Sequence, residues 1–126
     1  MNRVKLLSAL LLAGALTLSA QSKKPIQLHC DLEVDPAREQ EMLTNYSKTF
    51  KPAITKQPGF VEVELLKFRE VIGGKVSPLA YRINISFQTE DQRKTWVATD
   101  LHQQAWPTIE KTLKGEKYRC VLYDVK

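Results

Sequence analysis

Apolar and polar residues alternate along four short stretches of the chain, which is typical of strands with one buried face. The clearest stretch is 26–34, where every second residue is apolar and the residues between them are polar. The same alternation runs through 60–69, 79–87 and 118–125. A Gly-Gly pair at 73–74 separates the second stretch from the third, so these two strands are expected to form a long hairpin.

Two other stretches carry apolar residues three and four positions apart, a spacing that predicts amphipathic helices. The first follows Asp35-Pro36, a capping residue with proline at the first helical position, and Pro52 is expected to kink this helix or end it early. The second begins after Thr89 and runs in two pieces to Leu113, with Gly115 at the position of a helix C-cap.

The predicted order of elements is β-α-β-β-α-β, which indicates an α+β fold of the ferredoxin-like type. The most economical arrangement is a four-stranded antiparallel sheet in the order 4-1-3-2 with both helices on one face. The other face would stay open and would carry Phe60, Leu66 and Phe68 beside charged residues. Because a second copy could cover this partly apolar face, we expect a homodimer.

The first 20 residues have the features of a cleavable secretory signal. Arg3 and Lys5 precede an uncharged run over 6–18, and Leu18-Ser19-Ala20 at the end of the segment is interpreted as the cleavage region. The run is shorter than the roughly 20 apolar residues that span a bilayer, so no membrane anchor is expected after cleavage. We therefore expect an exported protein, periplasmic or secreted, with one domain over residues 21–126.

The charge of the chain is mild and dispersed. There are 19 Lys and Arg against 14 Asp and Glu, and loss of Arg3 and Lys5 with the signal leaves a net charge of +3. The basic residues are not gathered with aromatic residues into a patch or stripe. Proteins that bind nucleic acids usually show such a patch, so no nucleic-acid partner is expected.

Three segments resemble the antibiotic biosynthesis monooxygenase family: the helix-to-strand junction 56–61, the strand 81–87 and the helix start 89–96, continued by 96–102. The resemblance implies a dimeric α+β barrel and oxygenation of a small aromatic or quinol-type substrate without a cofactor. Family members that oxidise aromatic polyketides resemble this chain at Asn84, which makes Asn84 a candidate catalytic residue. Haem-degrading members carry other residue types at the positions of Cys30, Phe87 and Trp106, so haem is not expected.

The face of the sheet that meets the helices could line an apolar pocket. The strands would contribute Cys30, Tyr81, Ile83, Ile85, Phe87 and Leu122, and the second helical region Trp96, His102 and Trp106. In such a pocket His102 would be the proton acceptor, and Tyr81, Phe87, Trp96 and Trp106 would bind the substrate. The alternative is a filled core with His102 at its wet edge.

Two further groups of residues could carry chemistry. On the open face, His29 and Asp31 belong to a polar cluster that is either a site inside a dimeric barrel or a hydrated ion-pair network. Cys30 and Cys120 lie near the middle of neighbouring strands, where they form either a disulfide or two buried thiols. Their spacing from the histidines follows no metal-site pattern, so no metal is expected.

Two functions therefore remain open from the sequence. One is an exported, cofactor-independent monooxygenase for a small aromatic molecule. The other is a non-catalytic dimeric module of the same fold that binds a ligand or acts as a scaffold. A cavity that contacts His102 and Trp106 would favour the enzyme, and a filled core would favour the module.

Overall fold

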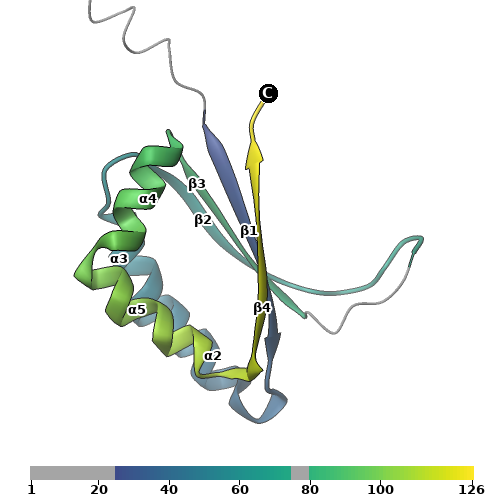
Figure 1. The fold of residues 1–126 in the computed structure, drawn as a ribbon. Coiled ribbons are helices and arrows are strands. Elements are labelled where there is room, and N and C mark those ends of the chain that lie inside the picture. Colours follow the sequence, from purple (N-terminus) through teal and green to yellow (C-terminus); the bar gives the residue numbers. More distant parts are fainter. Residues whose placement is uncertain (1–24, 75–79) are drawn as a thin grey trace, which may run out of the picture.

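The computed structural model describes residues 25–74 and 80–126. They form a four-stranded sheet with two helical regions on one side of it (Figure 1). The expected signal over residues 1–20 and the start of the third predicted strand at Leu79 lie outside the described residues. The elements in chain order are β1 (Ile26–Val34), η1 (Pro36–Arg38), α2 (Glu39–Asn45), η2 (Tyr46–Phe50), α3 (Lys51–Thr55), β2 (Phe60–Lys67), β3 (Tyr81–Phe87), α4 (Glu90–Ala98), α5 (Asp100–Glu110) and β4 (Leu113–Asp124).

The sheet has the strand order β2-β3-β1-β4 with antiparallel pairs throughout, so the predicted fold and strand order are confirmed. The strand β1 lies between β3 and β4, and Cys30 is paired with Ile83 on one side and with Cys120 on the other. Alternation along β1 therefore sends Cys30 and Leu32 toward the helices and the polar residues between them toward the open face. Among the helices of the described residues, none is long and apolar enough to cross a membrane.

Two expectations about the strands are corrected by irregularities in the ladder. The register between β2 and β3 shifts between Phe60 and Glu62, so Phe60 packs against the core and its ring meets Phe87 edge-on at 6.2 Å. Simple alternation had placed Phe60 on the open face, but a bulge reverses the side on which a residue emerges. The strand β4 begins at Leu113, and Gly115, with φ 62°, lies within its irregular first part instead of capping a helix.

The first helical region continues past Pro52 and ends at Thr55, contrary to the expectation of an early end. Its middle is a turn of π-helix, η2, in which the backbone N–H of Lys51 donates to the carbonyl oxygen of Tyr46, five residues back. Proline lacks the N–H that an α-helical bond needs, and a widened turn just before it accommodates this loss. The helical region therefore continues through Pro52, and Tyr46 and Phe50 remain buried.

The second helical region consists of two pieces, as the sequence predicts, and the structure places the division at Thr99. The side chain of Thr89 caps α4 by accepting a hydrogen bond from the backbone N–H of Gln92 at 3.2 Å, and Thr99 caps α5 in the same way. Thr99 has an extended backbone with ψ 154°, which ends α4 and lets α5 start in a new direction. Both helices pack on the inner face of the sheet (Figure 1).

Cys30 and Cys120 form a disulfide that joins the central strand β1 to the edge strand β4. The two cysteines are 90 residues apart in the sequence and directly opposite in the ladder. A cross-link that closes such a long loop restricts the unfolded chain far more than the folded one. The disulfide therefore stabilises the fold mainly by reducing the entropy of the unfolded state.

We predict that reducing the disulfide lowers the free energy of unfolding by on the order of 4 kcal/mol, the entropy of a loop of this length. Urea unfolding curves recorded with and without a phosphine reductant measure the difference. The double variant Cys30→Ala/Cys120→Ala is the control, because its curve should not respond to the reductant. Equal stability of the oxidised and reduced proteins would contradict the prediction.

Candidate functional site

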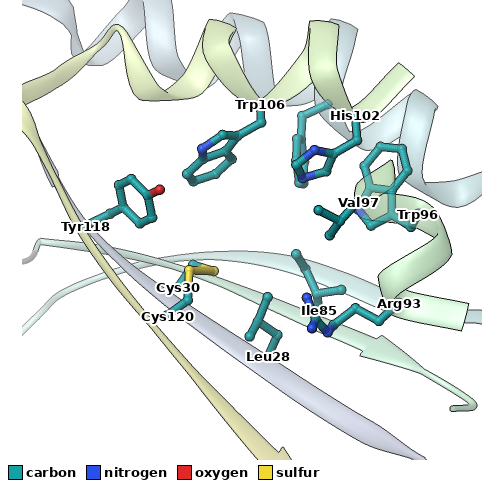
Figure 2. A pocket seen from close by; sticks show the side chains of 11 residues that line it. Leu28, Cys30, Ile85, Arg93, Trp96, Val97, His102, Trp106, Tyr118 and Cys120 are labelled. Atoms are coloured by element: carbon teal, nitrogen blue, oxygen red, sulfur yellow. A yellow bond between two sulfur atoms is a disulfide. The ribbon is translucent and has the colours of Figure 1, made fainter. Parts of the chain in front are cut away.

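A cavity of about 290 Å³ lies between the inner face of the sheet and the helices (Figure 2). This volume is near the lower limit of small-molecule sites, so it suits a ligand of one or two rings. Most of the wall is apolar or aromatic, and the strands and helices both contribute to it. The lining residues are Leu28, Cys30, Phe50, Ile85, Arg93, Trp96, Val97, His102, Trp106, Tyr118 and Cys120.

The break at Thr99 positions His102 at the cavity. The Oγ1 atom of Thr99 accepts a hydrogen bond from the backbone N–H of His102 at 3.1 Å and donates one to the carbonyl oxygen of Trp96 at 2.7 Å. His102 thereby lies in the first turn of α5, with its ring edge-to-face against Trp96 at 4.9 Å. Figure 2 shows the imidazole projecting from α5 into the cavity between Trp106 and Trp96.

The surroundings of His102 favour the uncharged imidazole. Burial lowers the pKa of His102 below its ordinary value of 6.5, and the positive charge of Arg93 lowers it further. Its Nδ1 atom is buried and has no hydrogen-bond partner among the described residues. A neutral imidazole can accept a proton at pH 7, so His102 has the protonation state that a general base needs.

Aromatic side chains form the opposite end of the cavity. Trp106 of α5 meets Tyr118 of β4 edge-on, with ring centroids 5.1 Å apart, and lies 6.2 Å from Phe50. Phe50 also contacts Trp96 at 6.1 Å and connects the two tryptophans. Edge-to-face contacts at these distances hold rings in defined orientations. The cavity thus has rigid aromatic walls that suit a flat ligand.

Arg93 brings a positive charge to the cavity. Its Nε donates a hydrogen bond to Oε1 of Glu90 at 2.6 Å, one turn earlier on α4. The side chain of Arg93 is 19% exposed, and in Figure 2 it extends from α4 toward Ile85 on the sheet side of the cavity. Sequence reasoning missed Arg93, because a charged residue on an amphipathic helix usually points to solvent.

The sulfur atoms of the disulfide belong to the wall of the same cavity (Figure 2). Cys30 is almost fully buried, whereas Cys120 is on the exposed edge strand. Of the two alternatives that the sequence left open, the structure has the disulfide, and it holds β4, with Tyr118, beside the cavity.

Only part of the predicted pocket is assembled. Trp96, His102 and Trp106 come together at the cavity, and Cys30 and Ile85 join them from the sheet. Four other predicted side chains, those of Tyr81, Ile83, Phe87 and Leu122, do not line it.

Two of the four had been assigned to substrate binding. Phe87 is completely buried in the core, and the hydroxyl of Tyr81 donates to Oε2 of Glu39 at 2.6 Å, away from the cavity. The reason is that the cavity lies toward the β4 side of the sheet, whereas the helices cover β3 tightly.

Asn84 is not brought together with His102. It is paired with His29 of β1 and Glu64 of β2, and these three residues face the open side of the sheet. Its Oδ1 atom is buried without a hydrogen-bond partner among the described residues. The sheet therefore separates the two residues that had been grouped as candidate catalytic residues.

The polar cluster on the open face is organised around Asp31. Its carboxylate accepts two hydrogen bonds from Arg82, at 2.7 and 3.2 Å, and lies 3.6 Å from Arg119. The hydrogen bonds to Asp31 raise the pKa of the Arg82 guanidinium. His29 is hydrogen-bonded to Gln27 at 3.1 Å and contacts the ring of Tyr123. These contacts correspond to the ion-pair network that the sequence left as an alternative.

Within 25–74 and 80–126, no group of three or more His, Cys, Asp or Glu side chains could hold a metal ion. No family model matches the sequence, and no curated protein matches it.

Several solved structures match the fold at low sequence identity. A candidate antibiotic biosynthesis monooxygenase from Caulobacter crescentus has a TM-score of 0.67 at 18% identity, covering 82% of this chain and 92% of that chain. SnoaB from Streptomyces nogalater, a cofactor-independent oxygenase, has a TM-score of 0.67 at 16% identity, covering 82% and 94%. This chain has the ferredoxin-like fold of the antibiotic biosynthesis monooxygenases. The expected resemblance is confirmed at the level of the fold.

A third neighbour bears on assembly. A dimeric ferredoxin-like protein of unknown function from Jannaschia sp. has a TM-score of 0.69 at 14% identity, covering 80% of this chain and 99% of that chain. TM-scores of this size at such low identity establish a shared fold alone. Proteins described as dimeric are thus found among the neighbours of this fold.

We predict that His102 titrates below pH 6.5 and that Arg93→Gln raises its pKa, because the substitution removes a nearby positive charge. The unfolded chain protonates first as the pH falls below 6.5, so this residue makes the fold less stable toward acid. Proton NMR of the imidazole measures the pKa, and His29→Gln assigns the two histidines. An unchanged titration in Arg93→Gln would contradict the electrostatic coupling.

Proposed function

We propose that this protein is an exported, cofactor-independent monooxygenase of the antibiotic biosynthesis monooxygenase type that acts on a small aromatic or quinol-type molecule. The observation that carries the proposal is the cavity, which is lined by aromatic side chains and contacts His102 and Trp106. A filled core, the arrangement expected of a module without a site, is not what these residues form.

The size and shape of the cavity support a flat substrate. Its volume of about 290 Å³ accommodates one or two rings, and Trp106, Tyr118 and Phe50 offer faces and edges for contact. Burial between such side chains excludes water from the ring and strengthens electrostatic interactions within the site. SnoaB, which shares the fold, is described as a cofactor-independent oxygenase, and this description supports the reaction class.

The chemistry would begin with a proton transfer from a substrate hydroxyl to the neutral imidazole of His102. The resulting anion is electron-rich, and the positive charge of Arg93 would stabilise it. The anion then reduces O₂ directly, and the oxygen–oxygen bond breaks after carbon–oxygen bond formation. For a quinol, the balance is quinol plus O₂ giving hydroxyquinone plus water, so the substrate supplies all four electrons.

His102→Gln should lower the rate of oxygen uptake with a reactive quinol by about 100-fold or more, the usual contribution of a general base. An oxygen electrode measures the rate, with the spontaneous oxidation of the quinol subtracted. His29→Gln is the matched control, because it removes the other histidine, on the opposite face of the sheet. If both variants oxidised every quinol tested as fast as the wild type, His102 would have no catalytic role.

The non-catalytic alternative has one observation in its favour. Asn84, which the resemblance suggested as a catalytic partner, lies on the other face of the sheet and cannot act together with His102. A protein that binds aromatic ligands in the cavity but consumes no oxygen with any of them would be a binding module.

We further propose that the protein acts as a homodimer through the open face of the sheet. Leu66, Phe68 and Tyr123 are 42%, 40% and 50% exposed there, beside the ion pairs of Asp31. A second copy that packs on this face would bury these apolar side chains, and neighbours of the same fold are described as dimeric.

Light scattering of the protein without its signal should give the mass of a dimer, and Leu66→Lys should shift it to a monomer by placing a charge in the interface. Leu101→Lys is the matched control, because Leu101 is similarly exposed, at 46%, but lies on α5. A monomeric wild type, or a dimer unaffected by Leu66→Lys, would exclude this interface.

A further inference from the structure

The hydrogen bonding of Arg93 leaves part of its guanidinium group free. Only Nε has a partner among the described residues, Oε1 of Glu90 at 2.6 Å, although the group has five N–H donors. The side chain is 19% exposed and lines an otherwise apolar cavity. The donors on the two terminal nitrogens are therefore available to a ligand in that cavity.

The positive charge of Arg93 acts on another side chain of the cavity, His102. Burial is the main cause that lowers the pKa of His102, and the positive charge of Arg93 lowers it further. Glu90 compensates this charge only from the side of α4, and its second oxygen, Oε2, is buried without a partner among the described residues. A second anion on the cavity side would complete the coordination of the guanidinium.

We propose that the cavity binds an aromatic carboxylate, with the carboxylate on the terminal nitrogens of Arg93 and the ring between Trp106, Tyr118 and Phe50. The planar guanidinium matches the two oxygens of a carboxylate and can hold it through two parallel hydrogen bonds. The inference rests on the proposed function: it assigns the acidic group to a substrate whose ring occupies the proposed site.

This arrangement gives Arg93 a role in specificity. A ligand with a carboxylate forms an ion pair with Arg93 and can accept two parallel hydrogen bonds from it, whereas its neutral amide analogue forms no ion pair and accepts through one oxygen only. The carboxylate also fixes the orientation of the ring relative to His102. The substrate class is thereby narrowed from any small aromatic molecule to one that bears an acid group on the ring.

Calorimetric titration with 2-naphthoate and with its neutral analogue 2-naphthamide tests the proposal. Neither compound has the phenolic hydroxyl with which the proposed reaction begins, so binding is measured without turnover. The wild type should bind the carboxylate at least about tenfold more tightly than the amide, as expected for an ion pair that also forms two hydrogen bonds. Arg93→Gln should abolish this preference and leave the affinity for the amide within about twofold of the wild type.

Three variants separate a local contact from a general effect of charge. Lys94→Gln removes one positive charge from the neighbouring, exposed position on α4 and should keep the preference for the carboxylate. Glu90→Gln removes the competing anion from Arg93 and should strengthen carboxylate binding. Arg93→Lys, which keeps the charge, should restore part of the preference, whereas a purely structural role of Arg93 predicts no such rescue.

The outcomes distinguish this inference from the proposed function. If naphthoate and naphthamide bind with equal affinity, and Trp106→Ala weakens both, the aromatic site stands and the carboxylate assignment is overturned. If neither compound binds to the wild type, both the site and the assignment are overturned. Circular dichroism of each variant confirms that the fold is retained before the affinities are compared.

Discussion

The pairing of β1 with both of its neighbours is the constraint on which the rest of the structure depends. Its register with β3 and β4 decides which side chains face the helices, because a slip by one residue would turn every side chain to the other face. The same register places Cys30 opposite Cys120, so the disulfide follows from it. The apolar cavity and the polar open face both follow from the alternation of apolar and polar residues along the strands.

The two faces of the sheet have different electrostatic properties, and the difference assigns their roles. On the helix side, burial keeps His102 neutral, and Arg93 brings a positive charge into largely apolar surroundings. On the open side, Asp31 is already paired with Arg82 and Arg119. The proposed chemistry on a small molecule belongs to the first face, and the proposed association with a second copy belongs to the other.

The candidate site was partly accessible from the sequence, for reasons that differ from residue to residue. Trp96, His102 and Trp106 were identified because the second helical region was expected to present them to the inner face of the sheet. Arg93 was missed because charge on an amphipathic helix normally marks the solvent side. Among the strand residues, periodicity shows which face a side chain occupies but not whether a helix covers it, so Tyr81 and Phe87 were assigned to the pocket and are core.

The sequence by itself determined the order of the elements, the strand pairing and the inner face of each strand, because these follow from local periodicity and from capping and turn residues. The tertiary structure alone decided where the helices leave space. It also decided that a bulge turns Phe60 inward and that a π turn before Pro52 keeps Phe50 at the cavity. Such features depend on how the helices pack against the sheet, and this packing involves residues that are far apart in the chain.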